Sequence, residues 1–138
     1  MIVKYSLLIQ AAKKAKQYSH APYSNFRVGA AVLNKAGKIY TGCNIENSSY
    51  SLTICAERTA LFKALSESRV AFTALAIASD SDELISPCGA CRQVILDLAG
   101  DIDIILTSRN GKSRLLRSTE LLPLPFTEQS LSRFQKKK

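Results

Sequence analysis

Pro87-Cys88-Gly89-Ala90-Cys91, read together with Cys55-Ala56-Glu57, is the stretch around which this sequence is organised. Cys88 and Cys91 are three residues apart, so on a helix their side chains lie one turn apart on the same side. Cys55 can supply a third thiolate from elsewhere in the chain. Three protein ligands leave the fourth tetrahedral position of a zinc ion open, and an open position distinguishes a catalytic zinc site from a closed structural one. The two stretches therefore predict a catalytic zinc site.

Glu57 follows Cys55 by two residues, which places it roughly 200° further round a helix that turns about 100° per residue. The carboxylate is therefore not expected to bind the same ion, and it is free to act as a general acid and base beside it. A glutamate of ordinary pKa is ionised at neutral pH and ready to accept a proton. This pairing predicts metal-assisted hydrolysis in which one carboxylate carries protons.

Length and composition indicate a single domain, residues 1–138, with 46% hydrophobic and 22% charged residues. No apolar run approaches the roughly 20 residues that span a bilayer. The first residues lack the basic region, apolar core and small-residue cleavage site of a signal peptide. We therefore expect a cytoplasmic protein that does not enter a membrane.

The cysteine count allows two interpretations. Cys43, Cys55, Cys88 and Cys91 could form two disulfides, but in a reducing compartment the same count favours metal binding. Cys43 stands apart from the two motifs and is interpreted as a small buried strand residue. The single histidine, His20, is interpreted as a surface or packing residue, because three cysteines do not need it as a ligand.

The net charge of +8 and the terminal run Lys136-Lys137-Lys138 raise the possibility of a nucleic-acid partner. The basic residues are scattered rather than arranged in a stripe, and aromatic residues are not interleaved with them. A terminal lysine run is usually a solvated tail. The charge pattern therefore disfavours nucleic-acid binding.

Apolar spacing and turn signals outline the secondary structure. Helices are expected at residues 4–18, from near Cys55 onward and at 89–98, with a helical turn at 119–122 and a weakly helical tail at 127–138. Strands are expected at residues 28–33, 38–43, 73–79, 102–107 and 114–117. This alternation predicts a three-layer α/β fold, a mixed five-stranded sheet with right-handed crossovers and helices on both faces. Both cysteine stretches then lie at helix N-termini, where partial positive charge favours thiolates.

Several segments together resemble the small cytidine deaminases of pyrimidine salvage, which are homotetramers with three cysteine ligands to zinc. The resemblance extends through most of the chain and is carried by six segments: 21–26, 28–31, 42–47 (Gly-Cys-Asn-Ile-Glu-Asn), 55–60 (Cys-Ala-Glu-Arg-Thr-Ala), 87–93 (Pro-Cys-Gly-Ala-Cys-Arg-Gln) and 120–123. A Cys-Ala-Glu motif alone would be weak evidence. Joined to Pro-Cys-x-x-Cys at about thirty residues it matches the three-cysteine form of the zinc deaminases.

The resemblance implies a role for each matching residue. Cys55, Cys88 and Cys91 would hold zinc, and Glu57 would be the acid and base. Substrate-binding positions would be Phe26 against the base, Asn44 and Glu46 on the ribose hydroxyls, and Ala56 with the loop at Ser86 on the pyrimidine amide edge. Tyr50 and Phe126 would reach a neighbouring subunit's pocket, although Leu124-Pro125 departs from the small residue that the family has before the phenylalanine.

The residues leave some of these roles open. Three thiolates give zinc a net charge of −1, which Arg58 could offset by donating to a sulfur, or Arg58 could form a surface salt bridge. Asn44 and Glu46 are two apart, so in a strand they address the same side. Without the family, Phe26 is interpreted as a core residue and Tyr50 is ambiguous.

The predicted activity is zinc-dependent hydrolytic deamination of cytidine and 2′-deoxycytidine to uridine and 2′-deoxyuridine plus ammonia. The alternatives are deamination of another aminopyrimidine nucleoside such as a nucleoside antibiotic, an RNA-directed deaminase, or a structural zinc module. The last would need a fourth ligand, for which Cys43 is the candidate.

Overall fold

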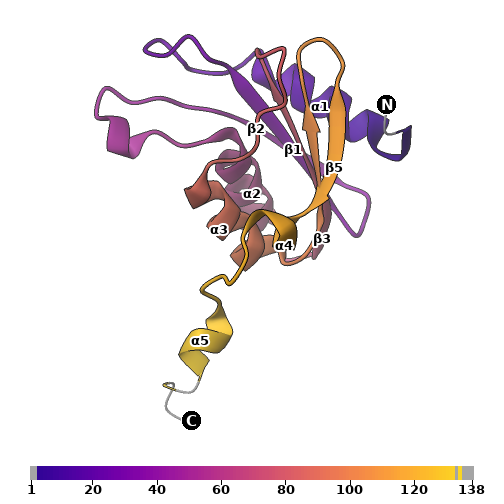
Figure 1. Cartoon of the computed structure of the whole chain (residues 1–138), viewed down its shortest axis with the longest axis vertical. Helices are drawn as coiled ribbons and strands as arrows, with labels where there is room; N and C mark the ends of the chain where they lie inside the picture. Colours follow the sequence, from indigo (N-terminus) through magenta and orange to yellow (C-terminus); the bar gives the residue numbers. More distant parts are fainter. Residues whose placement is uncertain (1–2, 133, 135–138) are drawn as a thin grey trace.

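A single five-stranded sheet forms the centre of the computed structural model, which describes residues 3–132 and 134 (Figure 1). The strand order is β2-β1-β3-β4-β5, and only β3 and β4 are parallel neighbours. The strands are β1 (Val28–Asn34), β2 (Ile39–Cys43), β3 (Phe72–Ser79), β4 (Asp103–Thr107) and β5 (Ser113–Arg117). The predicted mixed five-stranded sheet is confirmed, and each strand begins and ends within one residue of the range expected from the sequence.

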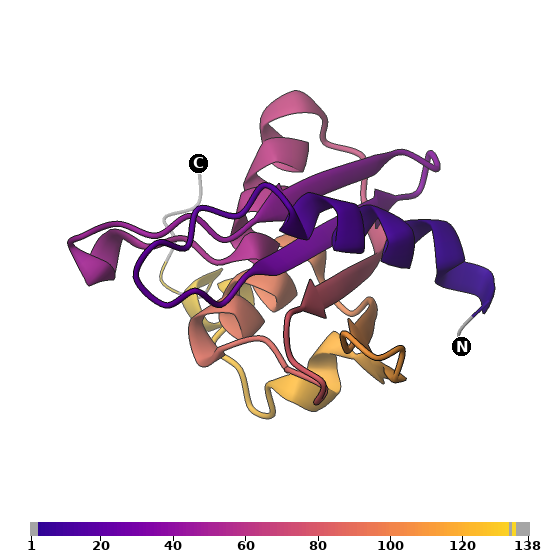
Figure 2. The same cartoon turned by 90° about the horizontal axis from the view of Figure 1, so that it is seen from above.

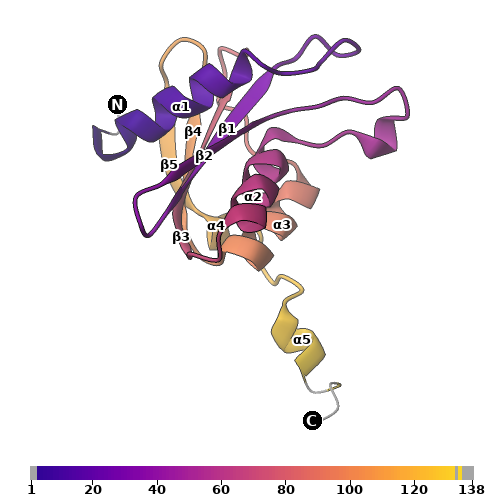
Figure 3. The same cartoon turned by 180° about the vertical axis from the view of Figure 1, so that it is seen from behind.

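Helices cover both faces of this sheet, as the sequence predicts. Helix α1 packs on one face and α2 and α3 on the other, so that Figure 3 shows α1 crossing the strands while α2 and α3 lie together. The helical elements are η1 (Val3–Tyr5), α1 (Ser6–Lys16), η2 (Tyr50–Leu52), α2 (Ala56–Glu67), α3 (Gly89–Ala99), α4 (Ser118–Leu121) and α5 (Glu128–Ser132).

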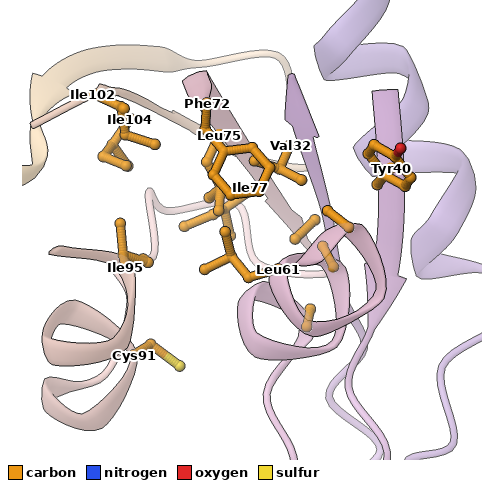
Figure 4. Close-up of a cluster of buried hydrophobic side chains, with 14 of the residues drawn as sticks. Val32, Tyr40, Leu61, Phe72, Leu75, Ile77, Cys91, Ile95, Ile102 and Ile104 are labelled. Atoms are coloured by element: carbon orange, nitrogen blue, oxygen red, sulfur yellow. The ribbon is translucent and has the colours of Figure 1, made fainter. Parts of the chain in front are cut away.

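Strand β3 is apolar along nearly its whole length because both of its faces are covered. On the α1 side its alanines pack against Leu8 and Ile9. On the other side Leu75 and Ile77 join a larger cluster with Leu61 of α2 (Figure 4). The same cluster contains Cys91 of α3, which is fully buried. The core therefore fixes the helix that carries one of the predicted zinc ligands.

Two glycines allow the helices to approach the β1–β2 hairpin closely. A Cβ at Gly42 would lie 2.4 Å from the backbone nitrogen of Ala60, and one at Gly29 would lie 2.1 Å from the carbonyl oxygen of Ala12. Any larger residue would have to push α2 or α1 away from the sheet. The position of α2, and with it the position of Glu57, depends on this contact.

Two loops project from the same edge of the molecule. The loop after α1 and the longer loop that contains η2 extend side by side beyond the sheet (Figures 1 and 2). At the other end of the chain α5 lies away from the sheet, which confirms helix within the expected tail. Residue 133 and residues 135–138, with the run Lys136-Lys137-Lys138, lie outside the described residues. In the portion that is described, no helix is long and apolar enough to cross a membrane.

An ion-pair cluster fastens the start of β1 to the end of β3. Asp80 accepts hydrogen bonds from Arg27 Nε at 2.9 Å and Nη2 at 3.1 Å, and it lies 3.1 Å from Lys16 Nζ. No role for Arg27 is predicted from the sequence. The Arg27 guanidinium, helped by Lys16, lowers the pKa of Asp80 to about 2. The cluster holds the backbone that follows Phe26.

We expect Asp80→Asn to lower the free energy of unfolding at pH 7. The carboxylate's pKa is depressed in the folded protein, so its contribution is present above its unfolded pKa and is lost as the pH falls through about 2. Because Asp80 is 24% exposed, the expected loss is discounted to about 1–2 kcal/mol. Urea unfolding of the wild type and the Asp80→Asn variant between pH 7 and pH 3 should show that the difference between their free energies of unfolding becomes smaller toward low pH.

Asp82→Asn is the matched control, since its pair with Arg109 is more exposed on both sides. The Asp80 charge would have no specific stabilising role if the loss of unfolding free energy in Asp80→Asn did not depend on pH. The same conclusion would follow if Asp82→Asn lost as much unfolding free energy as Asp80→Asn.

Candidate zinc centre and active site

Helices α2 and α3 begin close together, and each begins at a cysteine. Cys55 occupies the N-cap position of α2 and Cys88 that of α3, both with extended backbone. The Cys88 Sγ accepts a hydrogen bond from the Cys91 N–H at 3.4 Å, as an N-cap side chain does. The unpaired N–H groups of each first turn place partial positive charge near the sulfurs. The structure thus brings the two cysteine stretches together.

The three sulfurs are close enough to share one metal ion. The Sγ atoms of Cys55 and Cys88 are 3.8 Å apart, and those of Cys55, Cys88 and Cys91 all lie within 4.8 Å of one another. Zinc–sulfur bonds of about 2.3 Å in tetrahedral geometry separate two sulfurs by about 3.8 Å. The three thiols therefore fit a zinc ion.

The other cysteine does not complete this group. All four cysteines are free thiols, and Cys43 lies half-buried at the end of β2. Within residues 3–132 and 134, no fourth histidine, cysteine, aspartate or glutamate joins the three sulfurs. The disulfide interpretation is wrong for this structure, and the arrangement is that of an open site rather than a closed structural one.

Hydrogen bonding prepares one sulfur as a thiolate. Hydrogen bonds from the Cys91 thiol, from Arg58 and from Cys88 lower the pKa of Cys55 to about 5. The pKa of Cys91 is raised, first by its hydrogen bond to Cys55 and then by burial. Arg58 Nη2 lies 3.3 Å from Cys55 Sγ, and the bond raises the pKa of the Arg58 guanidinium. Among the residues described, Arg58 Nε is a buried donor without a hydrogen-bond partner. Arg58 therefore faces the sulfurs rather than a surface carboxylate.

Glu57 lies in the first turn of α2 and is only 4% exposed. Burial raises the pKa of its carboxyl, and the neighbouring Cys55 thiolate acts in the same direction. A hydrogen bond involving Cys91 works against the rise. The carboxyl is thus shifted toward the pH range in which it can both accept and return a proton.

A cavity of about 230 Å³ is lined by Glu57, Cys55 and Cys88. This volume is below the range of about 300–1,000 Å³ that is usual for ligand sites. Three residues predicted to bind substrate, Phe26, Asn44 and Ala56, line it together with Ser86. The remaining lining residues are Val28, Thr53, Ile77, Ile85 and Pro87. Phe26 is half-buried at this cavity, so its interpretation as a core residue does not hold.

Asn44 uses its side-chain amide to hold the neighbouring backbone. Its Oδ1 accepts from the Val28 N–H at 2.9 Å, and its Nδ2 donates to the Phe26 carbonyl at 2.8 Å. The Phe26–Val28 segment at the cavity mouth is therefore fixed by Asn44. This use of Asn44 is not visible in the sequence, because it depends on a backbone segment sixteen residues away.

Glu46 and Tyr50 lie in a neighbouring hollow of about 370 Å³ that also contains Tyr23 and Ser24 and shares Thr53 with the cavity. Glu46 accepts hydrogen bonds from the backbone N–H groups of Tyr23 and Ser24 and from the Ser24 hydroxyl. The Ser24 hydroxyl is the main reason that the pKa of Glu46 is lowered. Asn44 and Glu46 therefore address adjacent spaces.

Phe126 is the one predicted substrate-binding residue that lies apart from both spaces. It lines a separate groove with Phe62, Val94 and Leu131. Phe126 is 60% exposed, and Tyr50 is 73% exposed. Neither side chain fills the hydrophobic core of the chain.

Comparison with known proteins agrees with this geometry. Residues 3–107 match the family model for the cytidine and deoxycytidylate deaminase zinc-binding region. The chain belongs to the cytidine and deoxycytidylate deaminase family. A cytidine deaminase of Sporosarcina psychrophila is 49% identical over 126 residues, covering 91% of this chain and 93% of its own. The crystal structure of cytidine deaminase from Burkholderia pseudomallei superposes with a TM-score of 0.85 at 46% identity, covering 87% and 97% of the two chains.

A weaker match concerns another named activity. Blasticidin-S deaminase of Bacillus cereus is 38% identical over 108 residues, which are 72% of this chain and 76% of its own.

The matched family region includes all three clustered cysteines, and the family's metal is zinc. Zinc is therefore the cofactor of this deaminase.

Sequence reasoning did not single out four of the residues that line the cavity. Val28 and Ile77 come from adjacent antiparallel strands, and Thr53 and Ile85 come from loops that precede the two cysteines. Each has the sequence signature of an ordinary core or loop residue. The deaminase fold places them at the cavity, and no local signal distinguishes them beforehand.

We expect the purified protein to contain about one zinc ion per chain, from the single three-sulfur group of an open site. Cys88→Ser should lose most of this zinc, because the N-cap thiolate is replaced by a poor ligand. Cys43→Ser, the matched control, should retain it. Metal analysis after gel filtration measures the zinc content of the wild type and of both variants. Zinc loss in the Cys43 variant would show that a protein side chain occupies the fourth coordination position of the zinc ion.

Proposed function

We propose that this chain is a zinc-dependent cytidine deaminase that converts cytidine and 2′-deoxycytidine to uridine and 2′-deoxyuridine, with release of ammonia, in pyrimidine salvage. The observation that carries the proposal is the buried Glu57 carboxyl in a cavity that is also lined by Cys55 and Cys88, two of the three clustered cysteines. Family membership supports the same activity.

In this proposal Cys55, Cys88 and Cys91 hold the metal. Bound zinc supplies a Lewis acid and a water with a pKa near neutrality. Arg58 donates to the Cys55 sulfur and offsets the negative charge of three thiolates, which would otherwise weaken the metal as an acid. The helix N-termini at Cys55 and Cys88 act in the same direction.

Glu57 moves the protons that the reaction requires. It accepts a proton from the water that attacks C4 of the pyrimidine and delivers a proton to ring nitrogen N3. It then takes the second proton of that water from the hydroxyl now attached to C4 and passes it to the departing amino group, so that the C4–N bond breaks and water and cytidine yield uridine and ammonia with Glu57 again ionised. A carboxyl whose pKa is raised by burial is better matched to this two-way exchange at neutral pH than an exposed one.

The remaining predicted residues would orient the nucleoside. Phe26 offers an aromatic surface to the base, and the backbone at Ala56 and the loop at Ser86 would read the amide edge of the pyrimidine. Asn44 and Glu46 would bind ribose hydroxyls from the adjacent spaces that they line. Ordering of the Phe26 segment by Asn44 would add to that role.

We further propose a homotetramer of single-domain chains, residues 1–138, in the cytoplasm. Tyr50 and Phe126 would each reach a neighbouring subunit's pocket. Their exposure in the single chain, and the projection of the loop that carries Tyr50, support this arrangement. A small nucleoside is the expected substrate, without a nucleic-acid or membrane partner.

Deamination of a nucleoside antibiotic is the second candidate, favoured by the match to blasticidin-S deaminase. An RNA-directed deaminase is supported only by the net charge. Comparing initial rates on cytidine, blasticidin S and a cytidine-containing oligoribonucleotide separates the three. The proposal requires cytidine to be the preferred substrate by kcat/KM.

We expect Glu57→Gln to keep its zinc and to lower kcat for cytidine by about 10²–10⁴-fold or more, because the amide cannot carry a proton. The absorbance change from cytidine to uridine measures the rate, and metal analysis verifies the zinc. Glu67→Gln, on the exposed end of the same helix, is the control and should retain full activity. Wild-type turnover by the Glu57 variant would remove this residue from the mechanism.

Arg58→Gln should weaken both zinc retention and turnover, each by about tenfold, because the Cys55 thiolate loses its charged donor. Lys63→Gln removes the same charge from the exposed face of α2 and should change neither. Zinc release to a chromogenic chelator and steady-state kinetics provide the two readouts. Unchanged values in the Arg58 variant would leave this residue with a packing role only.

A further inference from the structure

Arg92 follows Cys91 on α3, and each nitrogen of its guanidinium meets a different acceptor. Nε lies 2.8 Å from the Pro87 carbonyl oxygen, and Nη2 lies 2.9 Å from the Ser86 hydroxyl. Nη1 lies 2.9 Å from the carbonyl oxygen of Leu121, the last residue of α4. One partly buried side chain therefore joins the loop before α3 to the end of α4.

The loop held by Arg92 forms part of the active-site cavity. Ser86 and Pro87 both line the cavity, and the next residue, Cys88, belongs to the sulfur group. The Pro87 carbonyl lies one residue before the N-cap of α3 and therefore outside the helix's own hydrogen-bond ladder. Arg92 supplies its donor from the helix that follows. Bonds from a charged guanidinium to such acceptors are stronger than neutral ones.

Gln93, the residue after Arg92, makes a similar contact with the chain beyond α4. Gln93 Nε2 donates to the Phe126 carbonyl at 2.8 Å. Successive residues on a helix point about 100° apart, so Cys91 addresses the sulfur group, Arg92 the Ser86–Cys88 loop, and Gln93 the C-terminal segment. The first turns of α3 thus connect the metal group, one wall of the cavity and the start of the C-terminal segment.

We propose that Arg92 is a positioning residue for the deamination reaction. It fixes the Ser86–Cys88 loop so that the cavity wall and the Cys88 sulfur keep their places relative to α2. The planar guanidinium fork can reach three acceptors at once, whereas a lysine ammonium in the same place cannot. This inference rests on the proposed function for its kinetic consequence, but not for its effect on the metal group.

The test compares Arg92→Gln and Arg92→Lys with the wild-type holoenzyme. KM for cytidine should rise about tenfold, while kcat changes by less than about threefold, because the loop binds substrate but Glu57 on α2 is untouched. Zinc release to a chelator should become about tenfold faster, as when other groups that orient a ligand are removed. Lysine should not rescue either value.

Arg114→Gln is the matched control, because Arg114 lines the same surface hollow as Arg92 from β5. Its KM and zinc-release rate should stay within about twofold of wild type, as for a surface substitution. If the Arg92 variants do not fold, Ser86→Ala removes one of the three acceptors and should shift KM in the same direction.

Unchanged KM and zinc release in the Arg92 variants, with or without a lower melting temperature, would overturn the inference. Equal changes in Arg114→Gln would also overturn it. A wild-type protein that does not turn over cytidine would instead refute the proposed function, and zinc release would still decide whether Arg92 positions the Cys88 loop.

Discussion

The meeting of two helix N-termini at one point is the constraint on which this site depends. Cys55 and Cys88 can approach to 3.8 Å only because α2 and α3 start side by side on the same face of the sheet. That placement depends in turn on Gly42, where α2 lies too close to β2 for any side chain. Backbone packing, rather than the cysteines themselves, therefore sets the distance between the sulfurs. The three sulfurs are thereby held close to the spacing that a tetrahedral zinc ion would require.

The site encloses groups that are ionised in the reaction, and burial makes an ionised group less stable. Enclosing Glu57 raises the pKa of its carboxyl, which is unfavourable for an ionised group but useful for a proton carrier. Gathering three thiolates would also be unfavourable without nearby positive charge. Arg58 and the two helix ends supply that charge. The same low-polarity surroundings therefore make the acid and base effective and make the compensating cations necessary.

The residues around the site form a connected set rather than isolated ligands. Asn44 holds the Phe26 segment, Asp80 holds Arg27 beside it, and Arg92 holds the loop that leads into Cys88. A small ligand cavity built mainly from loops needs such contacts to keep its shape. The fold supplies the strands and helices, and these polar side chains fix the loops between them.

The sequence by itself determined the element order, the mixed sheet and the group of three cysteines with Glu57. Hydrophobic periodicity is local, and the Cys-Ala-Glu and Pro-Cys-x-x-Cys motifs are short. The sequence did not reveal that Val28, Ile77 and Ile85 line the cavity. It also did not reveal that Arg27 pairs with Asp80, or that Arg92 donates hydrogen bonds to three acceptors. Those facts depend on strand register and on contacts between residues far apart in the chain. Only the tertiary structure decides which apolar residue faces a cavity instead of the core, because the local pattern is the same in both cases.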